Sequence, residues 1–60
     1  MKIGDLVKHN MLGMGIIAEI SEPTIIFPFQ IASVCFTDGQ AAELVTTTLH
    51  LIKSKNKVDI

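Results

Sequence analysis

The sequence predicts a small all-β fold, and three observations support this prediction. Isoleucine, valine and threonine are frequent throughout the 60 residues, and β-branched side chains fit the pleated surface of a sheet better than a helix. Glycines and prolines divide the chain into pieces about as long as a strand. Finally, an Asp38-Gly39 pair lies between two apolar runs, a pattern typical of a β-hairpin.

Five strands are expected, each an apolar run bounded by a glycine, a proline or a polar turn. The expected strands are Asp5–His9, Gly15–Ser21, Ile31–Thr37, Gln40–Val45 and Leu49–Lys53. Residues 10–14 are expected to form a loop. Gly13 and Gly15, within it and directly after it, are expected to supply backbone conformations that a Cβ atom would forbid.

The strongest turn signal is Asp38-Gly39, because this pair tolerates the positive φ angles of a type I′ turn. It predicts a hairpin between the strands on either side of it. In the first of these strands, alternation places Val34 and Phe36 on one face and Cys35 on the other. Phe36 is therefore expected in the core.

A helix is the second interpretation of residues 40–52, because apolar and threonine side chains recur there at helical spacing. These side chains are Ala41, Leu44, Val45, Thr48, Leu49 and Ile52. Asp38 could cap such a helix. Three consecutive threonines and the Asp-Gly turn favour the strand interpretation, with a short 3-10 turn near Thr46–Leu49.

A chain of this length supports one domain, which would span residues 1–60. Such a domain buries only about 60% of the surface of its unfolded chain, so its stability is marginal. Disulfide bonds are excluded because Cys35 is the only cysteine. The apolar content of 48% and the mean hydropathy of +0.47 are high for so small an interior. They indicate a homo-oligomer or a tightly bound protein partner.

The sequence also predicts the cellular compartment. No apolar run reaches the roughly 18 residues that a membrane span needs. Met1-Lys2 is followed after one residue by Gly4-Asp5, without the apolar stretch of an export signal. A lone cysteine fits a reducing environment. A cytoplasmic protein without a membrane partner is expected.

Several short motifs occur in an order that resembles a known group of folds. They are Gly4-Asp5-Leu6-Val7-Lys8-His9, Gly13-Met14-Gly15-Ile16-Ile17, Val34-Cys35-Phe36-Thr37-Asp38-Gly39, Leu44 and Leu49-His50-Leu51-Ile52. The pattern resembles the small SH3-like barrels of the Tudor, KOW and CarD-type groups, and it is similar to one-domain bacterial and phage proteins of that type. The resemblance implies a barrel of about five strands whose first and last strands lie side by side. It implies little about function, because such barrels host many unrelated roles.

The aromatic residues argue against two functions found among these barrels. Tudor domains bind methylated lysine or arginine in an aromatic cage, and signalling SH3 domains bind proline-rich peptides in an aromatic-lined groove. This chain has no tyrosine or tryptophan and only three phenylalanines, which are Phe27, Phe29 and Phe36. Neither a cage nor a groove is expected.

The segment 24–30 is almost wholly apolar, although it lies where a connecting loop is usually polar. Pro28 within it would block a ladder hydrogen bond. One interpretation is a lid that folds over a thin core. A second is a contact surface for self-association or a protein partner, formed by Ile25, Ile26, Phe27 and Phe29. A small-molecule pocket is the third.

The basic residues gather near the two ends of the chain. They are Lys2, Lys8, Lys53, Lys55 and Lys57. If the first and last strands are neighbours, these lysines could form a strip that binds the phosphate backbone of a nucleic acid. The alternative is a solvated sheet edge, which lysines protect from pairing. The net charge of -1 and the absence of arginine argue against a nucleic-acid partner.

No catalytic residue, metal site or cofactor is expected. The only soft metal ligands are His9, Cys35 and His50. Two histidines without a clear third ligand make a poor zinc site. A nucleophile would need an adjacent base and an orienting group, and no spacing indicates them.

The sequence thus predicts a non-catalytic interaction or self-assembly module that makes its contacts through Ile25–Phe29. One alternative is a nucleic-acid-associated accessory protein that uses the terminal lysines. The other is a subunit that completes a pocket in a small oligomeric enzyme.

Overall fold

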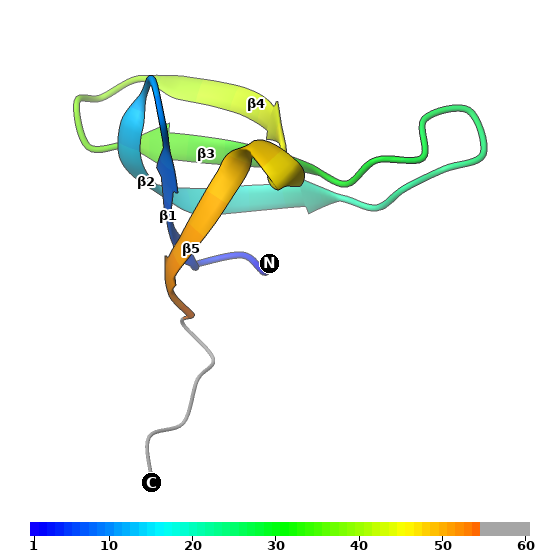
Figure 1. The fold of residues 1–60 in the computed structure, drawn as a ribbon, viewed down its shortest axis with the longest axis horizontal. Coiled ribbons are helices and arrows are strands. Elements are labelled where there is room, and N and C mark those ends of the chain that lie inside the picture. Colours follow the sequence, from blue (N-terminus) through cyan, green and yellow to red (C-terminus); the bar gives the residue numbers. More distant parts are fainter. Residues whose placement is uncertain (55–60) are drawn as a thin grey trace, which may run out of the picture.

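Five antiparallel strands form one sheet in the computed structural model, which describes residues 1–54 (Figure 1). The strands are β1 (Leu6–His9), β2 (Gly13–Ser21), β3 (Ile31–Phe36), β4 (Ala41–Val45) and β5 (Leu49–Lys53). A 3-10 turn, η1 (Thr46–Thr48), joins β4 to β5. The order across the sheet is β4-β3-β2-β1-β5, so the first and last strands are neighbours. The all-β prediction is confirmed, and each expected strand is present.

The helical interpretation of residues 40–52 is wrong, because this stretch contains β4, η1 and β5. The backbone of β4 pairs with β3, with Leu44 opposite Ala32. In η1, the Thr48 hydroxyl donates a hydrogen bond to the carbonyl of Val45 at 2.7 Å. The pairing of β4 with β3 and of β5 with β1 uses the backbone groups that a helix would need, which explains why the apolar spacing does not produce a helix.

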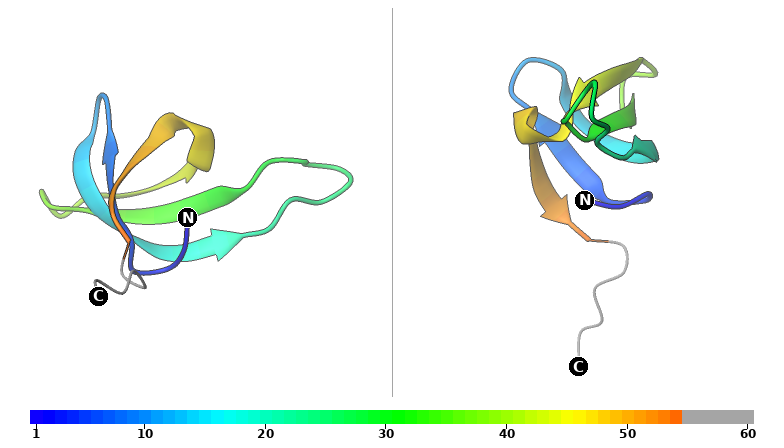
Figure 2. Two further views of the ribbon diagram at one scale, coloured as in Figure 1. Left: turned by 60° about the horizontal axis from the view of Figure 1, so that its bottom comes forward. Right: turned by 90° about the vertical axis from the view of Figure 1, so that its right-hand side faces the viewer.

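The sheet is strongly curved but is not closed into a barrel, which corrects the expectation of a five-stranded barrel (Figure 2). Its two edges are β4 and β5, and within residues 1–54 no ladder pairs one with the other. The short turn η1 carries the chain from β4 across the curve of the sheet, and β5 then pairs with β1. Register shifts place an extra residue at Ala18 in β2 and at Ile52 in β5. Such bulges increase the twist of a sheet without joining its edges here.

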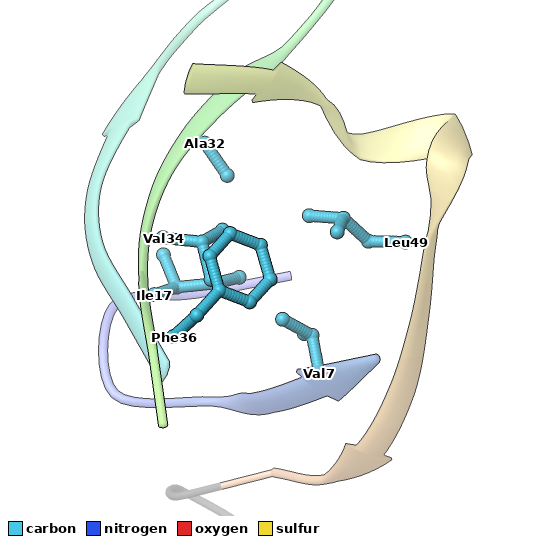
Figure 3. Close-up of a cluster of buried hydrophobic side chains, with 6 residues drawn as sticks. All are labelled: Val7, Ile17, Ala32, Val34, Phe36 and Leu49. Carbon is cyan, nitrogen blue, oxygen red and sulfur yellow. The ribbon is translucent and has the colours of Figure 1, made fainter. Parts of the chain in front are cut away.

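Six buried hydrophobic side chains fill the concave side of the sheet (Figure 3). They are Val7, Ile17, Ala32, Val34, Phe36 and Leu49. These residues come from β1, β2, β3 and β5, so strands far apart in the sequence share one core. Val34 and Phe36 are buried and Cys35 is exposed, as strand alternation predicts. So small a core leaves many of the apolar side chains outside it.

The turn between β3 and β4 differs from the predicted type I′ geometry. Among its residues only Gly39 has a positive φ, of 93°. The Gly39 amide donates to the carbonyl of Phe36 at 3.0 Å, and the Gln40 amide donates to the Asp38 carboxylate at 3.0 Å. A type I turn followed by a left-handed glycine gives this pattern. The predicted hairpin itself is confirmed.

Candidate functional site

The connection between β2 and β3 projects beyond the end of the sheet (Figures 1 and 2). Residues 25–29 within it are called the apolar loop below. Ile25 and Ile26 are 101% and 95% exposed, and Phe27 and Phe29 are about half-exposed. None of these four side chains is among those that form the core or pack against it. The interpretation of this segment as a lid is therefore wrong.

A tight turn holds the apolar loop in a defined shape. The Thr24 amide donates to the carbonyl of Phe27 at 2.9 Å, and the Phe27 amide donates to the Thr24 hydroxyl at 2.9 Å. The rings of Phe27 and Phe29 meet edge to face with their centroids 5.4 Å apart, an arrangement that aromatic pairs favour. Ile25 and Ile26 therefore lie at the head of an ordered turn. A pre-organised segment loses less conformational entropy when it binds.

A second apolar surface crosses the outer, convex face of the sheet. Residues directly opposite each other in antiparallel ladders share a face. The ladders align one residue from each strand in the order Lys53, Leu6, Ile16, Cys35 and Ala41. We call the apolar part of this line, from Leu6 to Ala41, the outer row. Ile16 is half-exposed, and Met14 lies beside it on the same face of β2.

The outer row was not among the surfaces predicted from the sequence. Its only signal is that Met14 and Ile16 are apolar at positions that alternate with the inward-facing Gly15 and Ile17. A strand that is apolar on both faces is typical of a sheet covered on both sides. The pairing of Ile16 with Cys35 depends on the register between β2 and β3, which no local pattern specifies.

Charged side chains of opposite sign flank the two apolar surfaces. Glu22 begins the connection that carries the apolar loop, and Glu19 lies opposite Ser33 on the outer face. Lys53 lies at the end of the outer row, and Lys8 lies opposite Met14 beside it. The end of the molecule that carries the apolar loop is therefore acidic. The outer row is basic at its β1–β5 end, whereas Glu43, opposite Ser33, lies beside its β4 end.

The pairing of β1 with β5 confirms that the first and last strands lie side by side. It brings two of the candidate lysines, Lys8 and Lys53, to the same face of the sheet. Lys2 is exposed in the segment before β1. Lys55 and Lys57 lie outside the described residues, so the structure does not place the whole predicted strip.

The histidines do not converge on a common site. His50 pairs with Lys8, so it faces away from the side on which His9 lies. His9 Nδ1 accepts hydrogen bonds from the amides of Met11 and Leu12 at 3.1 and 3.2 Å, which fixes the β1–β2 turn. Within residues 1–54, no three histidine, cysteine, aspartate or glutamate side chains are grouped so as to hold a metal ion.

Comparisons with known proteins give no relative. No protein-family model matches the chain, and no curated protein or solved structure is significantly similar to it. The resemblance to SH3-like barrels stays a prediction from the sequence. In the part of the chain that the structure describes, no helix is long and apolar enough to cross a membrane. Function must therefore be argued from the surfaces described above.

Proposed function

We propose that this chain is a non-catalytic self-association module whose contact surface is the apolar loop. The observation that carries the proposal is the nearly complete exposure of Ile25 and Ile26 at the head of an ordered turn. Burial of a fully exposed isoleucine contributes on the order of 1.5–3 kcal/mol. Exposed apolar side chains gathered in this way mark a contact site.

The order of the apolar loop supports binding over a merely flexible connection. The bonds between Thr24 and Phe27 and the contact of Phe27 with Phe29 exist before any partner binds. The surroundings of the thiol support a non-catalytic role. Cys35 faces Ile16 and Ala41 across its two ladders, so neither directly opposed residue is a base. A nucleophilic cysteine needs an adjacent general base.

The test is the molar mass across a concentration series, measured by light scattering. The wild-type chain is expected to exceed the monomer mass as its concentration rises. The double variant Phe27→Ser, Phe29→Ser is expected to raise the dissociation constant at least about tenfold, because it removes most of the aromatic area of the contact.

A matched control is the double variant Ile3→Ser, Met11→Ser, which removes two exposed apolar side chains outside the apolar loop. It is expected to associate like the wild type. A wild-type chain that stays monomeric at every concentration would rule out the proposal. So would an oligomer that the phenylalanine variant leaves unchanged.

A second candidate function is nucleic-acid binding, which is favoured by the placement of Lys8 and Lys53 on one face. Its test is titration with labelled duplex and single strands at about 50 mM salt, where electrostatic binding is strong. Binding that falls steeply with salt, and falls further in the variant Lys8→Gln, Lys53→Gln, would support it. No binding at that salt concentration would remove it.

A further inference from the structure

We propose that the apolar loop of one chain docks on the outer row of a second copy, and that two copies do so reciprocally in a two-fold dimer. This inference rests on the proposed self-association and specifies the surface that receives the loop. It joins two apolar surfaces of the same molecule that are both exposed and both lack a partner within the described chain.

The apolar loop cannot reach the outer row of its own chain. Ile16 lies five positions before Ser21, the last residue of β2, which is about 17 Å along a strand. The connection then continues away from the sheet (Figure 1). The turn between Thr24 and Phe27 holds the loop in this position. A contact between the two surfaces therefore requires another molecule.

Charge complementarity favours the β1–β5 end of the outer row as the place where the apolar loop docks. Glu19 and Glu22 accompany the loop, whereas Lys8 and Lys53 adjoin the β1–β5 end of the row. Glu43 lies beside the opposite, β4 end. Docking the loop on the row brings charges of opposite sign together, which promotes association and fixes register. Packing two loops against each other would instead bring like charges together. An anionic membrane surface would repel the same glutamates.

The area of the contact favours two reciprocal contacts over one. The loop offers about 100 Å² from each exposed isoleucine and about 100 Å² from each half-exposed phenylalanine ring, or about 400 Å². One loop on one row would therefore bury about 800 Å² in total, whereas a stable interface buries at least about 1,200 Å². Two reciprocal contacts bury about 1,600 Å², the size of a standard interface.

The native cysteine makes the docking testable, because Cys35 lies within the outer row and is the only cysteine. The variant Ile26→Cys adds a second thiol at the head of the apolar loop. A short bismaleimide is added to a mixture of isotopically labelled and unlabelled chains, and the linked peptides are identified by mass spectrometry. Links between residue 26 of one chain and residue 35 of another are expected to dominate.

Other outcomes separate this inference from the proposed function. The docking would be overturned if residue 26 linked only to residue 26 of the other chain, or residue 35 only to residue 35. The proposed self-association would still hold. The variant Ile3→Cys, which places the new thiol outside the loop, should give no comparable link to Cys35. A chain that never associates would overturn both, as would a loop that inserts into phosphatidylcholine vesicles while the protein stays monomeric.

Charge reversal supplies a second readout. Two double variants are each expected to weaken the dimer about tenfold. One combines Glu19→Lys with Glu22→Lys, and the other combines Lys8→Glu with Lys53→Glu. The combined variant, with all four reversals, is expected to recover to within about threefold of the wild type. The exposed substitution Thr47→Lys should have no effect. The docking would be contradicted if either double variant dimerised as tightly as the wild type. It would also be contradicted if the combined variant did not recover its affinity.

Discussion

Replacing Gly15 with alanine is expected to unfold a large fraction of the protein. A Cβ atom at Gly15 would lie 2.6 Å from Val34 Cγ1 and 2.7 Å from the backbone oxygen of Cys35. It would also lie 3.0 Å from the ring of Phe36. The backbone oxygen cannot move without distorting β3, so overpacking should cost about 3 kcal/mol. The core of a domain of this size contributes only about 3–5 kcal/mol to the free energy of unfolding.

The measurement is urea denaturation followed by circular dichroism, at a concentration low enough to keep the chain monomeric. The matched control is Gly13→Ala on the same strand. Gly13 has a φ of 88°, and a Cβ atom there would meet nothing within 4 Å. Alanine at Gly13 should therefore cost only the backbone strain of about 1–2 kcal/mol. Equal losses at the two glycines would contradict the role of close packing at Gly15.

The two glycines also show which structural features can be predicted from the sequence and which cannot. The prediction that Gly13 supplies a conformation forbidden to other residues is confirmed by its positive φ. The same prediction for Gly15 is wrong, since Gly15 lies in β2 with no positive φ and is required by the closeness of Val34 and Phe36. Those residues come from another strand, and their proximity depends on the register between β2 and β3.

The same distinction between local and distant determinants explains the rest of the fold. Strand positions depend on alternation and turn residues within a few positions, and each expected strand is found. The open sheet could not be predicted. Its edge strands remain apart because η1 leads the chain to β5, which pairs with β1. Short motifs are shared by closed and open sheets alike.

The candidate site was only partly predictable for the same reason. The apolar residues Ile25–Phe29 were evident from composition in a place where loops are polar. Whether they cover the core or project from it depends on the path of the chain after β2. The bonds between Thr24 and Phe27 turn the segment on itself, so the four side chains stay exposed. The outer row required all four ladder registers, which no single stretch of sequence contains.

The variant Asp5→Ala is expected to lose about 2 kcal/mol of the free energy of unfolding. Asp5 is 2% exposed, and its carboxylate Oδ2 accepts a hydrogen bond from the Lys2 amide at 2.8 Å. The backbone of Asp5 and of its neighbour Gly4 pairs with β2. The Ile17 amide donates to the Asp5 carbonyl at 3.1 Å, and the Gly4 amide donates to the Ile17 carbonyl at 2.8 Å. A hydrogen bond to a charged group contributes about 1.5–3 kcal/mol. The side chain therefore closes the N-terminal turn, whose backbone pairs with β2.

The control for this variant is Asp5→Asn, which keeps an oxygen acceptor of the same length. A neutral acceptor forms a weaker bond than a carboxylate, so Asp5→Asn should lose about 1 kcal/mol, less than the alanine variant. Urea denaturation gives the two losses, and hydrogen exchange locates them. The amides of Gly4 and Ile17 should exchange faster in Asp5→Ala, because local opening of the N-terminal turn becomes easier. Unchanged exchange at these amides, or an alanine variant as stable as the wild type, would show that the turn is held by its backbone bonds and the core alone.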